Sequence, residues 1–182
     1  MKSPTTVVLG ITGSIAAYKG ADLCSRMVKT GLDVNVIMTR SAQELIRPRT
    51  FLTLSRHPVV TDLWEIPDWR PGHIDLAEHA ALLVIAPCSA NFIGKMAHGI
   101  ADDALSTFVL SHEGKIIIAP AMNPRMWRNV AVRENMEILL RRGVIVVGPA
   151  VGPVACGDDG AGRMEEPSVI MTAIAAALTP QT

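Results

Sequence analysis

The stretch TTVVLGITGSIAAYK, residues 5–19, decides the fold of this chain. Its first part, Thr5–Leu9, is apolar or β-branched on both faces, as in a buried parallel strand. Gly10 and Gly13 permit a tight turn, and a predicted helix, Ser14–Thr30, follows with a good capping residue at its first position. The glycine spacing matches neither a dinucleotide fingerprint nor a Walker loop. A mononucleotide phosphate at the helix start and a plain strand–turn–helix junction both agree with this stretch.

The alternation of strand and helix continues along the whole chain. Apolar runs rich in β-branched residues predict strands, and the periodic segments between them predict helices. The predicted strands are Thr5–Leu9, Val34–Met38, Leu82–Ala86, Lys115–Ala119 and Val144–Val147, and the predicted helices are Ser14–Thr30, Asn91–His98, Asp103–Ser111, Val130–Arg142 and Ser168–Leu178. We therefore expect one α/β domain over residues 1–182, a Rossmann-like parallel sheet with helices on both faces. The least regular segment, Arg47–Gly72, is either a surface loop or a lid or oligomer contact.

Composition excludes several classes of protein. The 182 residues carry 17 Lys and Arg against 17 Asp and Glu, which gives no electrostatic case for nucleic acid or an anionic membrane. Three cysteines are too few for a disulfide framework, so a reducing compartment is expected. No signal peptide and no run of 18 apolar residues is present, and we expect a cytoplasmic protein. No pair of His or Cys has metal-ligand spacing, so no metal is expected.

Polar and small residues gather where the predicted strands end. In parallel α/β folds, ligands bind at the carboxyl ends of the strands. After the second strand, Thr39 and Ser41 could both donate hydrogen bonds to the same phosphate, although Ser41 could equally cap a short helix. After the third strand, Ser89 or Asn91 can cap the next helix. After the fourth, Asn123 precedes a proline in a favoured capping arrangement. A flat ring could lie against the backbone after the third and fourth strands, with Asn91 and Asn123 supplying polar contacts.

The sequence pattern leaves the roles of three further residues, Cys88, Cys156 and His73, open. The loop Gly152–Met164 holds four glycines, cannot pack a core and is long for a connection, which favours a functional loop. Cys156 within it is predicted to be accessible, as a proton donor or a nucleophile, whereas Cys24 on the first helix is predicted to be core and Cys88 stays undecided. His73 follows a glycine at the start of a short helical segment and is either a general base or a surface histidine.

Taken together, these motifs resemble those of the homo-oligomeric flavin-containing cysteine decarboxylases. The resemblance extends from Val7 to the last helix. The matching segments are residues 10–19, 73–76, 87–91, 120–127 and 155–164. The fourth segment is specific to this family, and the fifth to its branch in coenzyme A biosynthesis.

The resemblance implies a flavoprotein fold, FMN as cofactor, and oxidative decarboxylation of phosphopantothenoylcysteine to phosphopantetheine. It implies that FMN is bound by Gly13, Ser14, Ile15, Thr39, Ser89, Ala90, Asn91, Ala121 and Met122. It makes His73 the active-site base and Cys156 the proton donor, while Asn123, Met126, Ala155 and Arg163 bind the substrate. It also implies a homotrimer or homododecamer with the site between subunits.

Two positions depart from the family pattern, and other functions remain open. Phe92 stands where the family usually has Thr, and Cys88 where it often has a small residue, so a side-chain contact to flavin from Phe92 is not expected.

The alternative functions are a peptidyl-cysteine decarboxylase of the same family, a non-catalytic flavin-binding phosphatase regulator, and an electron carrier. Many relatives also carry a synthetase domain, so the chain is either stand-alone or cut from a longer protein.

Overall fold

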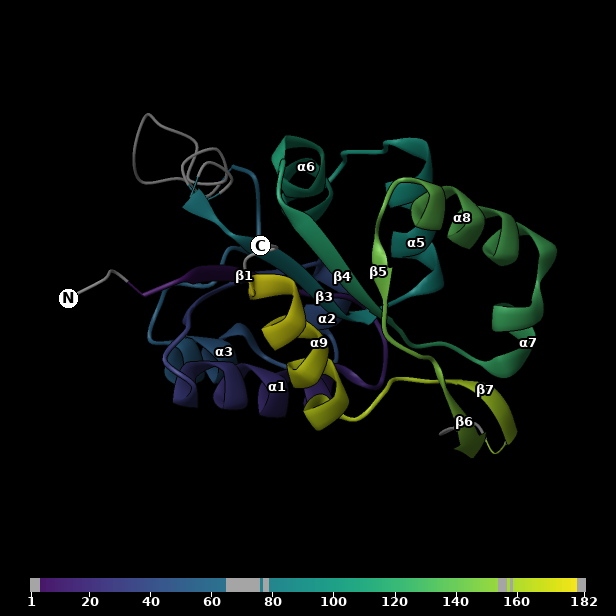
Figure 1. Cartoon of the computed structure of the whole chain (residues 1–182), viewed down its shortest axis with the longest axis horizontal. Helices are drawn as coiled ribbons and strands as arrows, with labels where there is room; N and C mark the ends of the chain where they lie inside the picture. Colours follow the sequence, from purple (N-terminus) through teal and green to yellow (C-terminus); the bar gives the residue numbers. More distant parts are fainter. Residues whose placement is uncertain (1–3, 65–75, 77–78, 154–156, 158, 180–182) are drawn as a thin grey trace.

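Five short apolar segments form one parallel sheet at the centre of the molecule, which we describe from a computed structural model covering residues 4–64, 76, 79–153, 157 and 159–179 (Figure 1). The strands are β1 (Thr6–Ile11), β2 (Asp33–Met38), β3 (Leu82–Cys88), β4 (Lys115–Pro120) and β5 (Ile145–Val146). Their order across the sheet is β2-β1-β3-β4-β5, and every neighbouring pair is parallel. The predicted α/β fold is confirmed, and the predicted strands are correct to within one or two residues at each end.

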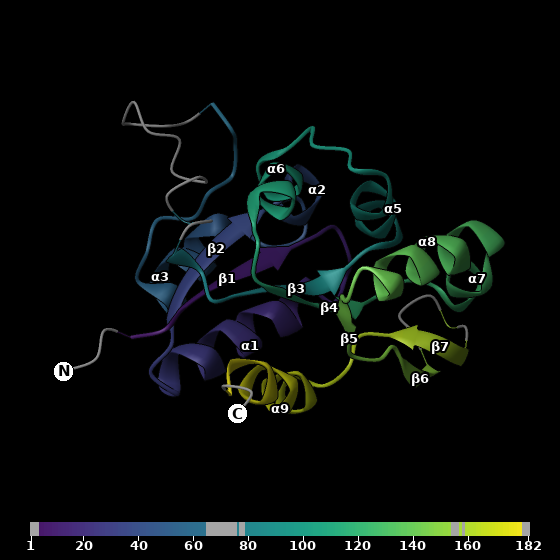
Figure 2. The ribbon, with the colours of Figure 1, turned by 45° about the horizontal axis from the view of Figure 1, so that its top comes forward.

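Helices cover both faces of this sheet (Figure 2). They are α1 (Ala17–Lys29), α2 (Arg40–Gln43), α3 (Pro48–Ser55), α5 (Ala90–His98), α6 (Ala104–Ser111), α7 (Pro124–Arg128), α8 (Val130–Arg141) and α9 (Pro167–Leu178). Helices α1, α3 and α9 pack on one face, and α5, α6 and α8 on the other. Among the described residues, no helix has the length and apolar character needed to cross a bilayer.

Alternating side chains of the strands divide the core into two layers. In β1, Val7 and Leu9 belong to the buried cluster that includes residues of α1 and α9, whereas Val8 belongs to the cluster of α5 and α6 on the opposite face. All three side chains are fully buried. This two-sided burial explains why the strands are apolar throughout instead of alternating with polar residues.

The predicted cap at the first strand end is wrong, and the cap by Ser41 that the sequence leaves open at the second does not occur. Helix α1 begins at Ala17, after a turn, and its capping position is Ala16, so Ser14 does not cap it. Ser14 instead lies in the turn, where its hydroxyl oxygen is 3.4 Å from the backbone N–H of Ala16. At the second strand, Thr39 and not Ser41 caps the short helix α2, because its hydroxyl accepts a hydrogen bond from Ala42 N–H.

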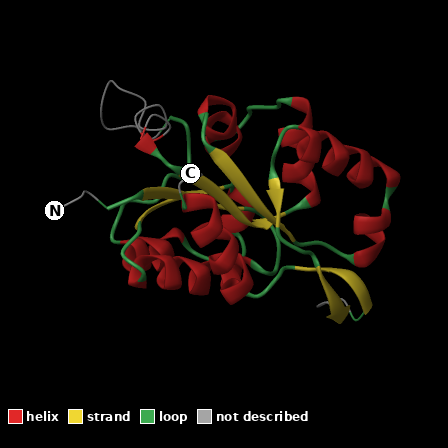
Figure 3. Ribbon diagram, in the orientation of Figure 1, coloured by secondary structure: helices red, strands yellow, loops and turns green. Residues whose placement is uncertain are grey.

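Two segments predicted as irregular contain regular structure. Residues 47–72 include helix α3, which has a proline in its first turn and packs Phe51 into the core. The loop 152–164 contains the antiparallel hairpin of β6 (Ala150–Pro153) and β7 (Asp159–Arg163), which stands apart from the central sheet (Figure 3). Three of the four glycines that suggested a loop, Gly152, Gly160 and Gly162, are therefore strand residues, and β7 lies against the turn that follows β4.

Candidate functional site

A cavity of about 1250 Å³ lies at the carboxyl edge of the sheet, and we call it the edge cavity. Its walls are the turns that follow β1, β2, β3 and β4, together with the first turns of α1, the start of α6 and the end of β7. Strand β1 has β2 on one side and β3 on the other, so the chain changes direction across the sheet at this point. Such switch points are where ligands bind in open parallel sheets.

Thr12 ties the first turn to the third. Its side chain is buried, and its hydroxyl donates to the carbonyl of Pro87 at 2.8 Å while accepting from the N–H of Ser89 at 2.9 Å. Thr12 cannot be recognised from the sequence, because its partners lie more than seventy positions away. One side chain therefore sets the spacing between two walls of the edge cavity.

Gly13 lets the first turn touch the second. A Cβ atom at this position would lie 2.5 Å from the Cβ of Ser41, closer than real side chains approach. Among the described residues, no hydrogen-bond partner occurs for the backbone N–H groups of Gly13 and Ile15. This corner of the edge cavity therefore combines unused backbone donors with the hydroxyls of Thr39 and Ser41.

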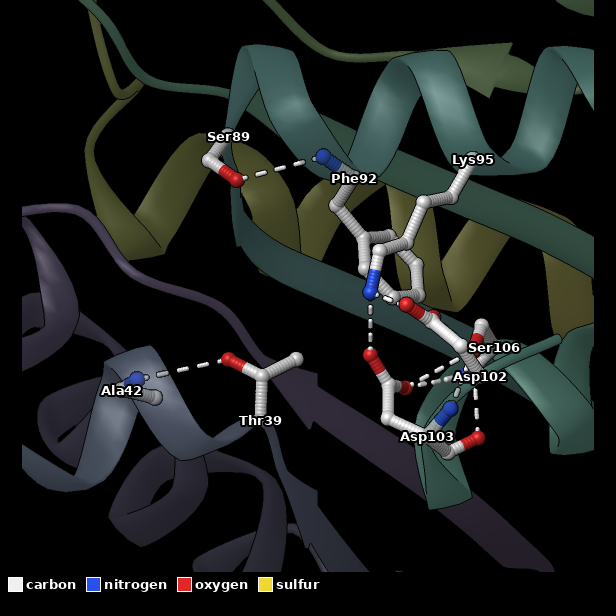
Figure 4. Close-up of polar contacts among 8 residues, drawn as sticks. All are labelled: Thr39, Ala42, Ser89, Phe92, Lys95, Asp102, Asp103 and Ser106. Carbon is white, nitrogen blue, oxygen red and sulfur yellow. Dashed lines mark hydrogen bonds and ion pairs between the residues drawn. The ribbon is translucent and has the colours of Figure 1, made fainter. Parts of the chain in front are cut away.

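The third and fourth turns are held by helix caps. The Ser89 hydroxyl accepts from Phe92 N–H at 3.3 Å, and the Asn123 side-chain oxygen accepts from Arg125 N–H at 2.7 Å. Both capping predictions are confirmed. Figure 4 shows the Ser89 hydroxyl facing the backbone nitrogen of Phe92, whose side chain is buried in the core, as is that of Cys88. Cys88 thus packs inward, and Phe92 is buried but still lines the edge cavity together with Ser89, Ala90 and Asn91 of the same turn.

The hairpin is anchored to the fourth turn and to helix α1. Met122 N–H donates to the carbonyl of Gly162 at 2.9 Å. The Lys19 ammonium donates to the Met164 carbonyl at 3.3 Å and to Glu166 at 2.8 Å. The Lys19 hydrogen bond lowers the pKa of the Glu166 carboxyl below its usual value. These contacts hold the end of β7 on the wall of the edge cavity.

A charged cluster closes the wall between α5 and α6 (Figure 4). The Lys95 ammonium lies 2.5 Å from Asp102 and 2.7 Å from Asp103. Asp103 also caps α6 in a reciprocal arrangement with Ser106. Burial lowers the pKa of Lys95, but its two carboxylate partners outweigh that effect, so the pKa is raised overall. Lys95 in turn lowers the pKa of Asp102.

We expect Lys95→Met to lower the free energy of unfolding by about 1 kcal/mol at pH 7, because two carboxylates then face each other without a cation. The folded-state pKa of Asp102 lies below its unfolded value, so the pair stabilises the fold above that unfolded value and loses its effect as the pH falls through the folded one. Urea unfolding should therefore show a difference between wild type and variant that narrows in acid. The exposed Lys29→Met is the control, and a pH-independent difference would contradict the expectation.

Both described thiols are protected. Burial raises the pKa of Cys24 to about 11 and that of Cys88 further still. Cys24 is in the core, as predicted, and Cys88, left open by the sequence, is buried too.

Because only the thiolate is nucleophilic, Cys24 and Cys88 should resist iodoacetamide at pH 8 in the native protein and react only after urea is added. Peptide mapping by mass spectrometry checks this result. Modification of either residue in native protein at the rate of free cysteine would show that these side chains are accessible.

The edge cavity brings together every predicted site residue that the structure describes. These are Gly13, Ser14, Ile15, Thr39, Ser89, Ala90, Asn91, Ala121, Met122, Asn123, Met126 and Arg163. The predicted residues His73, Ala155 and Cys156 lie outside the described residues. Sequence reasoning missed Thr12, Lys19, Lys95, Asp102 and Glu166, which line the same cavity. Among the described residues no cluster of His, Cys, Asp and Glu could hold a metal ion.

Comparison with known proteins identifies relatives of this arrangement. The coenzyme A biosynthesis bifunctional protein CoaBC of Vibrio cholerae is 46% identical over 162 residues, which is 88% of this chain but only 41% of that protein. A PPC decarboxylase complexed with pantothenoylaminoethenethiol superimposes with a TM-score of 0.84 at 29% identity, covering 95% of this chain and 97% of that one. SpaF, of the FMN-dependent cysteine decarboxylases, gives 0.81 at 32% identity, covering 97% and 99%. The flavoprotein family model matches residues 1–179, and the chain belongs to the flavoprotein family.

Proposed function

We propose that this chain is an FMN-dependent decarboxylase that converts phosphopantothenoylcysteine to phosphopantetheine in coenzyme A biosynthesis. The observation that carries the proposal is the edge cavity, which gathers the phosphate-binding, ring-binding and substrate-binding residues expected of such an enzyme. The similarity to CoaBC, to PPC decarboxylase and to SpaF supports it. Since the chain spans 41% of the Vibrio cholerae protein, the proposal concerns only the reaction of the matched part.

The residues of the edge cavity fit FMN. The Gly13 turn leaves a side-chain-free corner with unused N–H groups, and Thr39 supplies a hydroxyl beside it, which suits a phosphate. Ala121 and Met122 offer small and apolar surface at the opposite wall, which suits a flat ring. When bound, FMN would accept an electron pair from the cysteine-derived part of the substrate and later return it.

The residues of the chain would supply binding, orientation and proton transfer. Asn123, fixed by its cap at the start of α7, would bind the substrate carboxylate, with Met126 and Arg163 beside it on the wall. His73 would act as the base in the oxidative half of the reaction. Cys156, in the connection between β6 and β7, would donate the proton in the reductive half, next to Ala155.

We further propose a single flavin-binding domain that assembles as a homotrimer or homododecamer in the cytoplasm. Its balanced charge permits self-association, and no nucleic-acid or membrane partner is proposed. Light scattering of the flavin-loaded protein tests the assembly, and an active monomer would refute it.

The decisive experiment combines a spectrum with an assay. The purified protein should be yellow, release a flavin in acid that chromatographs as the mononucleotide, and form phosphopantetheine with loss of carbon dioxide. Release of the dinucleotide, or no flavin after reconstitution, would refute the cofactor. A peptide ending in cysteine should be offered in parallel, because a peptidyl-cysteine decarboxylase is the second candidate and SpaF, an FMN-dependent cysteine decarboxylase, is similar to this chain as well. Turnover of that peptide alone would establish the second candidate.

A further inference from the structure

Most of the charged side chains that line the edge cavity form ion pairs with one another. The cations among the described lining residues are Lys19, Arg40, Lys95 and Arg163. Lys19 and Arg163 both face Glu166, at 2.8 and 3.5 Å. Lys95 faces Asp102 and Asp103, as described above. The remaining lining carboxylate, Asp22, is paired with Arg26 at 2.9 Å, outside the cavity.

Arg40 differs from the other three cations. Within the described part of the chain, it has no carboxylate at ion-pair distance, and its side chain makes no hydrogen bond. It lies between Thr39 and Ser41 on the turn after β2. That turn touches Gly13 of the first turn, so Arg40 flanks the corner where hydroxyls and unused N–H groups gather.

We propose that Arg40 binds the phosphate of the cofactor and thereby makes this site prefer FMN over riboflavin. This inference rests on the proposed function. A dianionic phosphate at the corner gains a charge-assisted partner in Arg40 without breaking an existing ion pair. The same contact from Lys95 would take the cation away from Asp102 and Asp103, and from Lys19 it would leave Glu166 with only the longer contact to Arg163; both changes cost free energy. Among the described lining cations, Arg40 can therefore meet an incoming anion without giving up an ion pair, whereas Lys19, Lys95 and Arg163 each have one.

The test compares two flavins that differ only in the phosphate. Flavin is removed from the full chain, and rebinding of FMN and of riboflavin is followed by quenching of flavin fluorescence. Arg40→Gln should weaken FMN about tenfold and leave riboflavin within about twofold, so the preference for FMN collapses. Arg40→Lys keeps the charge and should retain most of the preference. Arg133→Gln, an exposed position on α8, is the matched control and should behave as wild type.

Each other outcome overturns a defined statement. If Arg40→Gln leaves the ratio of FMN to riboflavin affinity unchanged, Arg40 does not select FMN through its phosphate. In that case FMN binding by the wild type still supports the proposed function. Equal loss of both flavins also overturns it, because the residue would then only support the shape of the turn. If that ratio of affinities is unchanged but the variant has a higher KM for phosphopantothenoylcysteine and not for pantothenoylcysteine, Arg40 binds the phosphate of the substrate instead. If wild type binds neither flavin, the proposed function itself fails.

Discussion

Gly162→Ala should lower the decarboxylation rate by about a hundredfold while leaving a folded protein. Gly162 lies in β7, where its backbone packs directly against the fourth turn. A Cβ atom there would overlap the carbonyl oxygen of Met122 and lie 3.2 Å from the nitrogen of Pro124. Both neighbours are backbone atoms that cannot rotate away, so β7 itself must move. The hydrogen bond from Met122 N–H to the Gly162 carbonyl would be lost or lengthened.

Such a movement separates two groups that the proposed reaction needs together. The turn carries Asn123, and the hairpin carries the connection that contains Cys156. A misplacement of about 1 Å is enough to cost about a hundredfold in rate when reacting groups must be aligned. Steady-state kinetics and thermal unfolding of the variant measure the rate and the stability separately.

The matched control is Gly94→Ala on helix α5. The nearest atom to a Cβ there is an Asn135 side-chain nitrogen at 3.6 Å, an ordinary contact. Alanine also favours helix over glycine by up to about 1 kcal/mol, so this variant should be active and slightly more stable. A normal rate in Gly162→Ala would show that the hairpin can shift without effect on the site.

The central sheet could be predicted because its signal is local. Each strand is a short apolar run buried on both faces, as Val7, Val8 and Leu9 illustrate. The place of the site could be predicted for a second reason. The topology of a parallel sheet brings the turns after all its strands to one edge. The family motifs then supplied roles that local pattern alone left open, as for Asn123.

The missed features depend on contacts between distant residues. Thr12 looks ordinary in sequence, and only the fold brings Pro87 and Ser89 to its hydroxyl. The pairing of β6 with β7 runs through Gly152 and Gly160, whose composition suggests a loop. Which carboxylates neutralise which cations in the edge cavity likewise follows from packing. The phosphate preference proposed for Arg40 could not have been reached from the sequence, because it depends on that assignment.

The variant Cys156→Ser should release carbon dioxide but form phosphopantetheine on the order of a hundred times more slowly. If Cys156 donates the proton in the reductive half only, oxidation and loss of carbon dioxide do not need it. A serine hydroxyl has a pKa far above the thiol value of about 8.5, so it is a poor acid at neutral pH. The enethiol, lighter than phosphopantetheine by two hydrogens, should then accumulate, and the flavin absorption should stay bleached.

The variant His73→Asn is compared with Cys156→Ser, because it should block the reaction before carbon dioxide is released and not after. A base needed in the oxidative half must act before carbon dioxide leaves, so this variant should release none while keeping its flavin. Mass spectrometry of the products beside the flavin spectrum distinguishes the two blocks. The buried thiols Cys24 and Cys88 are not expected to substitute as donors, because neither lines the edge cavity and burial raises the pKa of both. Normal phosphopantetheine formation by Cys156→Ser would remove Cys156 from the mechanism, whereas a folded, flavin-bound variant without carbon dioxide release would place its role before decarboxylation.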